Sequence, residues 1–324
     1  LKTPSGINVW ETLGIRCINI LVDHPYWYHE IISNMPGDGI ILCIDRNHMK
    51  YVSRYYPEIP ICGFLPHGGT ISDEVSKNGL KEIKDRSIDV LYAGSLNADY
   101  GNIKRPDFSN LTFDGDKIYD KALEYLLKNT SQTVEYAVEK VLDQENIVLD
   151  EEAKRVFISS CRSLESILGT QFRVGLLEGI AKAGIKLTIY GSNWEKCEWV
   201  NLPNVSYGGR ISPKEVLNKM ADSKIVLNSM PWFKDGSHER IFNGMLNGAV
   251  VATENNPYLS EINDNENIIL FNTGDTDFPE RIKELIADAV SLQRVSDKAV
   301  VEAREIHTWQ QRAREIHFDL LKML

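Results

Sequence analysis

The N-terminal part of the chain alternates short apolar runs with polar segments of helix length. The apolar runs are residues 17–22, 40–44 and 61–65. Runs of four to eight apolar residues with such spacing are typical of buried parallel strands joined by helices. The pattern therefore predicts half of a doubly wound α/β sheet, with polar residues at the strand ends where such sheets bind ligands.

A second alternating series begins at residues 88–92 and predicts a second doubly wound parallel sheet. Strands are expected at 185–190, 205–207, 225–228, 249–253 and 268–271, and helices at 174–183, 213–223 and 239–247. Between the first two strands, the composition predicts a charged helical insertion at about 117–170. We expect domains at 1–87 and 88–306, with a C-terminal helix at 307–324 that packs back.

The composition narrows the classes of partner and compartment. The 324-residue chain carries 46 acidic and 36 basic residues, a net charge of -10 that opposes binding to nucleic acid. No apolar run approaches the roughly 18 residues that span a bilayer, and the N-terminus has no secretory pattern, so a cytoplasmic protein is expected. Because the chain starts at Leu1, without Met, and soon enters a strand, we expect the first domain to be incomplete.

One predicted helix carries the residues best suited to a phosphate ligand. Asp235, Gly236 and Ser237 form a turn that leads into the helix at 239–247. The N-terminus of a helix offers unpaired N–H groups and a partial positive charge, and His238 and Arg240 could add donors. The alternative is a solvated helix start, in which these side chains only cap the helix.

Hydroxyl recognition is expected on the same helix. Glu239 and Asn243 are four residues apart and share one helical face, where a carboxylate and an amide can bind vicinal hydroxyls. Turns at the ends of other strands carry Gly94 with Ser95, Gly191, and Arg210. Several such turns at one sheet edge predict a ligand cleft.

These motifs resemble the CgeB-like (spore maturation protein) type of group 1 glycosyltransferases. The resemblance rests on LTIYG at 187–191, VSYGG at 205–209, HERIFNGMLNG at 238–248 and the C-terminal residues His307, Thr308, Trp309 and Arg312. Weaker matches are VDHP at 22–25 and LPHG at 65–68. The resemblance implies a GT-B fold of two Rossmann-like domains, with the acceptor on the side of residues 1–87.

The resemblance also implies an activity: transfer of a hexose or N-acetylhexosamine from a nucleotide-diphosphate sugar, with a UDP-sugar favoured. The acceptor would be a hydroxyl of a glycan, a protein or a small molecule, and neither a cofactor nor a metal is implied. Carried over by position, Gly94 and Ser95 would lie near the donor sugar or phosphate, and Gly191 and Arg210 near the nucleotide. His238, Glu239 and Arg240 would lie at the diphosphate and ribose.

The sequence departs from the family at one pair of positions. The E-x7-E pair of the broader group corresponds here to Asp235 and Asn243, so retention or inversion stays open. A catalytic base would come from Asp23, His24 or His67, which follow N-terminal strands; for Asp23 and His24, polar strand caps are the alternative.

Two Asp-x-Asp sequences, at 114–116 and 275–277, lie in predicted turns and not after a strand that faces a phosphate, so no metal site is expected.

Two alternatives to a transferase remain. A nucleotide-sugar epimerase can share the fold, and a non-catalytic nucleotide-sugar-binding module would keep the donor site alone. The sequence leaves the nucleotide base, the sugar, the acceptor and the oligomeric state open.

Overall fold

The computed structural model describes residues 8–263 and 266–320, which form two compact units. Unit 1 contains the residues up to Pro66, Lys104–Ser166 and Trp232–Gly236. Unit 2 contains His67–Ile103, Ile167–Pro231 and the residues from Ser237 onward.

Unit 1 holds a three-stranded parallel sheet with the order β1-β2-β3. The strands are β1 (Ile18–Leu21), β2 (Ile40–Cys43) and β3 (Ile61–Phe64), each inside a predicted apolar run. Its helices are α1 (Val9–Leu13), α2 (His29–Ile32), α3 (Arg46–Tyr55), α5 (Gly115–Lys128), α6 (Val134–Gln144) and α7 (Glu151–Ser160). The central strand β2 is fully buried, as expected for a parallel sheet covered by helices.

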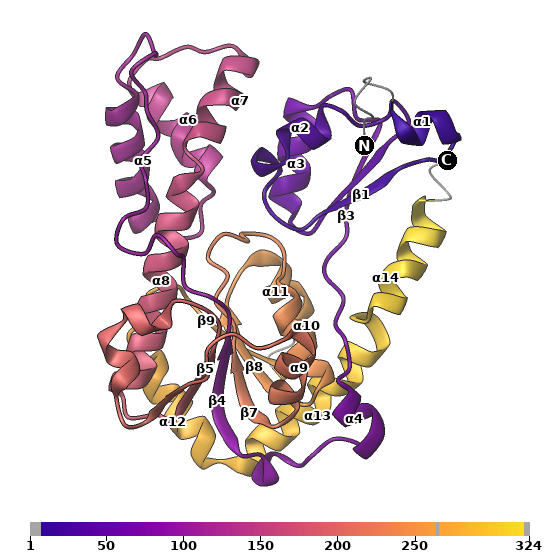
Figure 1. The fold of residues 1–324 in the computed structure, drawn as a ribbon, viewed down its shortest axis with the longest axis vertical. Coiled ribbons are helices and arrows are strands. Elements are labelled where there is room, and N and C mark those ends of the chain that lie inside the picture. Colours follow the sequence, from indigo (N-terminus) through magenta and orange to yellow (C-terminus); the bar gives the residue numbers. More distant parts are fainter. Residues whose placement is uncertain (1–7, 264–265, 321–324) are drawn as a thin grey trace. The chain divides into compact units, whose positions relative to one another are not determined.

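Unit 2 holds a six-stranded parallel sheet with the order β6-β5-β4-β7-β8-β9 (Figure 1). The strands are β4 (Ile88–Ala93), β5 (Leu187–Tyr190), β6 (Val205–Tyr207), β7 (Ser223–Leu227), β8 (Val250–Glu254) and β9 (Ile268–Phe271). Each predicted strand is present to within two residues. The strand order reverses between β4 and β7, and the crevice at such a switch point is where open α/β sheets bind ligands.

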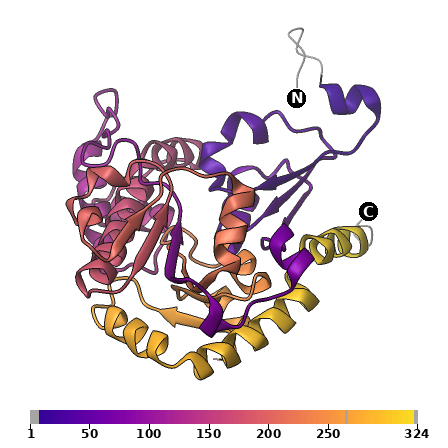
Figure 2. The ribbon, with the colours of Figure 1, turned by 60° about the horizontal axis from the view of Figure 1, so that its bottom comes forward.

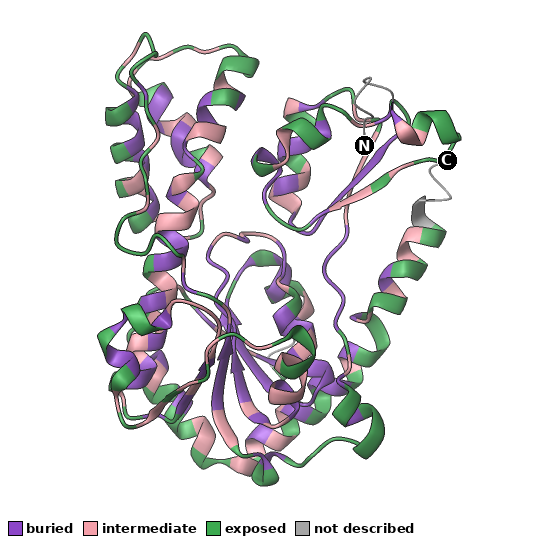
Figure 3. Cartoon of the chain, viewed as in Figure 1, coloured by how far each residue is buried: buried purple, intermediate pink, exposed green. Residues whose placement is uncertain are grey.

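Helices cover both faces of this sheet, so the residues of its central strands β4, β7 and β8 are mostly buried (Figure 3). The helices of unit 2 are α4 (Asp73–Asn78), α8 (Ser163–Lys182), α9 (Pro213–Ala221), α10 (Glu239–Leu246), α11 (Pro257–Ile262), α12 (Phe278–Ala287), α13 (Ala289–Ile306) and α14 (Trp309–Glu315). Val90 and Ile225 pack with α8 and α12, whereas Leu91 and Val226 pack with α9. Helices α12, α13 and α14 follow one another along one side of the unit (Figure 2).

The grouping into units differs from the sequence-based boundary near residue 87. Helix α4 packs against α9, so residues 67–87 join unit 2. Helix α7 packs against α3, so most of the helical segment expected within the second domain joins unit 1 instead. The helix expected at 174–183 begins at Ser163 and runs without interruption to Lys182. Local periodicity predicts helices and strands, but it does not predict how they group into units, because the contacts between them join residues far apart in the sequence.

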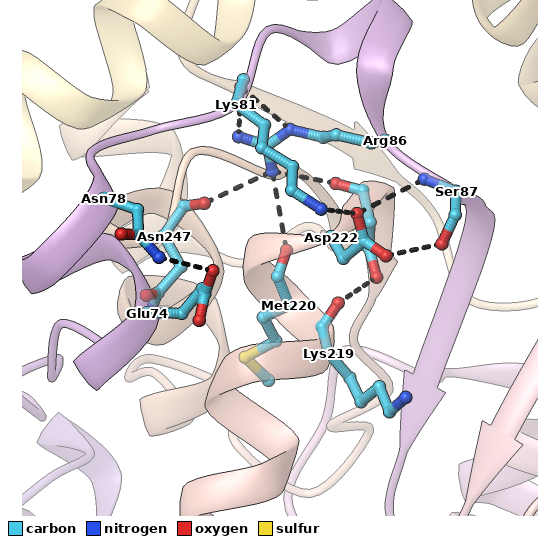
Figure 4. A network of polar contacts seen from close by, with 10 residues as sticks. Glu74, Asn78, Lys81, Arg86, Ser87, Lys219, Met220, Asp222 and Asn247 are labelled. Carbon is cyan, nitrogen blue, oxygen red and sulfur yellow. Dashed lines mark hydrogen bonds and ion pairs between the residues drawn. The ribbon is translucent and has the colours of Figure 1, made fainter.

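A buried arginine fixes the C-terminal ends of α9 and α10 (Figure 4). Arg86 Nη1 donates to the carbonyls of Ser223 at 3.0 Å and Asn247 at 3.2 Å, and Nη2 donates to the carbonyl of Lys81 at 3.0 Å. Burial lowers the pKa of Arg86 to about 10. The C-terminal ends of the two helices are therefore anchored inside unit 2, while their N-terminal ends point to the sheet edge where the candidate site lies.

Candidate functional site

A cavity of about 680 Å³ opens in unit 2 at the carboxyl ends of β4 and β5, beside the N-terminal ends of α9 and α10. We call it the switch-point pocket. Eight of the residues singled out in the sequence line it: Gly94, Ser95, Gly191, Arg210, His238, Glu239, Arg240 and Asn243. Its position at the strand-order reversal matches the rule for ligand sites in open α/β sheets.

Backbone groups form one wall of the pocket. Gly94 N donates to the Tyr190 carbonyl at 2.9 Å, and Gly191 N donates to the Gly209 carbonyl at 2.8 Å. Gly191 has a φ of 137°, and a Cβ there would lie 2.2 Å from the carbonyl oxygen of Gly94. Only glycine allows the turns after β4 and β5 to approach so closely, which leaves the backbone itself open to a ligand.

The helix α10 begins with a histidine cap. His238 Nδ1 accepts a hydrogen bond from Arg240 N at 3.1 Å. Loss of solvation, together with the positive charge of Arg240, holds the pKa of His238 well below its ordinary value. The ring is therefore neutral at pH 7, and because Nδ1 accepts, Nε2 carries the hydrogen and acts as a donor.

Arg240 is both a wall of the pocket and a structural tie. Its Nε donates to the Ala93 carbonyl at 2.7 Å and its Nη1 to Asn228 Oδ1 at 2.5 Å. The guanidinium lies over the ring of Tyr92, 5.4 Å from its centroid, and the residue is 9% exposed. Arg240 thus joins α10 to the ends of β4 and β7, a role that the sequence did not indicate.

Two further pocket residues on α10, Glu239 and Asn243, differ in the groups that they present to a ligand. Glu239 is exposed and lines the pocket, so its carboxylate is accessible. Asn243 Oδ1 accepts from Thr70 N at 2.8 Å. That contact uses the amide oxygen, so Asn243 can serve a ligand through its NH₂ group.

Three predicted donor residues lie outside the pocket lining. Asp235 pairs with Arg46 at 3.4 Å, and Gly236 bridges to Asp45, both within unit 1. Ser237 is fully buried, and its hydroxyl has no hydrogen-bond partner in the part of the chain that the structure describes. A contiguous stretch of sequence therefore divides between two units, which spacing alone does not reveal.

Among the candidate bases, His67 belongs to unit 2. Its ring lies 6.2 Å from that of His238 and packs edge-on to Trp309, and its buried Nδ1 has no partner within residues 8–263 and 266–320. Burial, aided by the charge of Arg312, lowers the pKa of His67 to about 4. The ring is thus neutral at pH 7.

The C-terminal motif fixes the segment that carries His67. Arg312 Nε donates to the His67 carbonyl at 3.1 Å, and Gly69 N donates to the His307 carbonyl at 2.7 Å. The C-terminal motif therefore packs against the segment that carries His67.

Asp23 and His24 lie in unit 1. Asp23 is exposed and accepts from the Tyr28 hydroxyl at 3.1 Å. His24 is buried; its Nδ1 accepts from Tyr26 N at 3.3 Å, and its Nε2 lies 3.4 Å from a carboxylate oxygen of Glu135. Both ring nitrogens of His24 therefore face groups of unit 1, as a structural role requires.

The sequence reasoning missed Arg173 on α8. Its Nη1 donates to the Ser95 carbonyl at 2.8 Å, which places a guanidinium at the turn that lines the pocket. The charge of Arg173 also contributes to the low pKa of His238. The two residues are 78 positions apart in the sequence and are separated by a helical segment. Their contact could therefore not be predicted from local spacing.

The two Asp-x-Asp sequences serve local backbone geometry. Asp114 accepts from Lys117 N and caps α5, and Asp275 accepts from Asp277 N in a loop. Within the described ranges, no cluster of three or more His, Cys, Asp or Glu side chains could hold a metal ion. All five cysteines have free thiols.

None of the helices in the described part of the chain is long and apolar enough to cross a bilayer.

Comparison with solved structures defines the class of fold. The chain is similar to sucrose-phosphate synthase from Thermosynechococcus elongatus, with a TM-score of 0.51, 10% identity, and coverage of 97% of this chain and 70% of that one. It is similar to Anabaena HepE in complex with UDP and glucose, with a TM-score of 0.51, 12% identity and coverage of 97% and 74%. An α-glucosyltransferase in complex with UDP-glucose and DNA containing an abasic site gives a TM-score of 0.50, 14% identity and coverage of 95% and 72%.

These likenesses confirm the expected GT-B fold. Residues 173–317 match the family described as glycosyl transferase-like. No curated protein sequence matches the chain. The matched segment carries α9, α10 and most of the residues that line the switch-point pocket.

Proposed function

We propose that the protein is a metal-independent glycosyltransferase that moves a hexose or N-acetylhexosamine from a nucleotide-diphosphate sugar to a hydroxyl acceptor. The favoured donor is a UDP-sugar, and the acceptor is a glycan, a protein or a small molecule. The observation that carries the proposal is the switch-point pocket itself. Its volume of about 680 Å³ lies within the usual range for small-molecule sites.

The charges around the pocket favour an anionic ligand. Arg210 and Arg240 line it, and Arg173 contacts its rim through Ser95. The N-terminal ends of α9 and α10 add partial positive charge at the same place. These groups would stabilise a departing diphosphate without a metal ion.

The relatives of known structure support a uridine nucleotide. HepE was solved with UDP and glucose, and the α-glucosyltransferase with UDP-glucose. That α-glucosyltransferase also holds DNA, but the charge of -10 on this chain opposes a nucleic-acid acceptor. The CgeB-like type, drawn from the sequence motifs, is part of the proposal.

Of the three candidate bases, we favour His67. Its Nδ1 is buried without a partner in the described residues, whereas both nitrogens of His24 face groups of unit 1. A neutral imidazole can accept a proton from an acceptor hydroxyl, although a pKa of about 4 makes it a weak base until a ligand changes its surroundings. Asp23 is the alternative, since its carboxylate is exposed.

Thermal unfolding with a panel of nucleotides tests the donor site. UDP, GDP, TDP and ADP and their sugars are added in the presence of EDTA. A ligand at a concentration of about 100 times its dissociation constant stabilises the folded protein by about 2.7 kcal/mol. We therefore expect one nucleotide family to raise the melting temperature by several degrees. Arg210→Ala should weaken this shift, because Arg210 is exposed in the pocket; the matched control is Arg304→Ala on α13, which is exposed outside it.

The outcomes separate the alternatives. No shift with any nucleotide would overturn the donor site. A shift without consumption of the nucleotide sugar, whatever acceptor is supplied, would favour the binding module. Conversion of the sugar without an acceptor would favour the epimerase.

A further inference from the structure

A second cavity, of about 430 Å³, lies in unit 2 beyond the carboxyl ends of β8 and β9. Its walls are one face of α8, the last residues of the two strands, the loop at 272–276 and Pro279 of α12. We call it the β9 cavity. It shares no lining residue with the switch-point pocket.

Two glycines of α8 face this cavity, and nothing in the described chain requires them to be glycine. A Cβ at Gly175 would meet no atom within 4 Å, and a Cβ at Gly179 would meet only Pro279, at 3.4 Å. Glycine inside a helix is less favourable than alanine by about 1 kcal/mol. A glycine that no protein neighbour requires is explained if a ligand approaches the helix backbone there.

The lining is suited to a neutral ring that carries hydroxyl groups. Phe172, Leu176 and Phe271 provide an apolar wall. Gln171, Asn272 and Thr273 provide amide and hydroxyl groups. The aliphatic face of a sugar ring packs on such a wall, while its hydroxyls exchange hydrogen bonds with amides and hydroxyls.

The charged groups of the lining oppose an anion. Its two charged residues are the acids Glu254 and Asp275, and no Lys or Arg lines it. Glu254 is 5% exposed, and its carboxylate accepts from Ser229 Oγ at 3.0 Å and Met230 N at 2.9 Å. Asp275 pairs with Arg281 at 3.5 Å outside the lining, and no cation of the lining itself would face a bound phosphate or nucleotide.

We propose that the β9 cavity is a second carbohydrate site, which holds a neutral saccharide independently of the switch-point pocket. The ligand is recognised by the apolar wall and by the polar side chains of Gln171, Asn272 and Thr273, and it lies against the glycine face of α8. The site does not depend on the donor assignment, so it can exist whether or not the protein binds a nucleotide sugar.

Saturation-transfer NMR with two neutral saccharides, maltotriose and N,N′-diacetylchitobiose, tests the site in the full chain with UDP present in excess. We expect at least one of them to bind with a millimolar dissociation constant and without displacement by UDP. Gly175→Leu should fill the cavity and weaken binding at least tenfold without lowering the melting temperature. Lys182→Leu, at an exposed position of the same helix outside the cavity, should bind as the unchanged protein does.

Thr273→Val is the second variant, because it keeps the shape of the side chain and removes its hydroxyl. It should weaken saccharide binding severalfold. The proposal is overturned if neither saccharide binds, if UDP displaces the bound saccharide, or if both variants bind it as tightly as the unchanged protein. Binding of the cation spermidine in the same cavity, with no binding of saccharide, would also overturn it.

Discussion

Arg240 lies at the point where the pocket and the core of unit 2 meet. The sequence singled it out, because a basic residue in the first turn of a helix after a strand is a local pattern, and Arg240 lines the pocket. It did not predict the bonds to Ala93 and Asn228, since these partners lie 147 and 12 positions away and depend on how β4 and β7 pair. Arg173 escaped detection for the same reason. Local patterns identify chemistry, whereas long-range pairing decides which atoms remain for a ligand.

Replacement of Arg240 should therefore cost stability as well as binding. Arg240→Met leaves the Ala93 carbonyl and the Asn228 amide oxygen without these donors, and we expect the free energy of unfolding to fall by about 2–4 kcal/mol. Urea unfolding measures this loss. Arg304→Met, at an exposed position, should change stability by less than about 0.5 kcal/mol. Equal stability of the two variants would contradict the structural role of Arg240.

At the scale of elements, the close approach of the turns after β4 and β5 depends on one glycine, Gly191. The strands themselves were predictable, because a parallel sheet that is buried on both faces requires continuous apolar runs in its strands. The small residues after them also marked the pocket edge. What the pattern did not contain was the distance between the turns, which is set by the register of Ala93 with Tyr190.

Gly191→Ala tests how tightly these turns are joined. The added Cβ would overlap the Gly94 carbonyl and force a residue with a side chain to adopt a φ of 137°, so we expect a loss of at least about 2 kcal/mol in unfolding free energy. Gly184→Ala is the control, because Gly184 has a φ of 79° but no atom within 4 Å of its Cβ position. Its loss should be about 1–2 kcal/mol, the cost of the backbone alone. If the two losses are the same, the close contact of the turns has no energetic weight.

At the scale of the whole molecule, buried imidazoles make the fold sensitive to acid. Burial lowers the pKa of His48 to about 4. The nearby His24 lowers it further, whereas the negative charges of Asp45 and Glu135 act to raise it. The unfolded chain binds this proton near pH 6.5 and the folded chain only near pH 4. The stability that neutral His48 contributes is thus present above pH 6.5 and is lost as the pH falls toward 4.

We expect the free energy of unfolding to fall between pH 7 and pH 4.5, with His48→Gln showing a shallower fall. By pH 4.5 the fall should be about 2.5 kcal/mol larger in the unchanged protein than in the variant, because the pKa of His48 is about 4 in the folded chain and 6.5 in the unfolded chain. His67 and the acids of unit 1 still titrate in the variant, so part of the slope should persist. Urea unfolding across the pH range measures both slopes; identical slopes would contradict the assignment to His48.

The assignment of residues to units was the least predictable feature of the whole molecule, because it depends on contacts such as those between α7 and α3. Unit 1 is built from three separate stretches, and its last stretch ends at Gly236, which pairs with Asp45. During synthesis, the first 66 residues must wait for another 170 before their unit is complete. At about 5–20 residues per second, this wait lasts roughly 10–35 seconds. Strands β1 to β3 lack the last stretch of their unit throughout that time, so we expect chaperone binding to the growing chain to be strongest before Gly236 emerges.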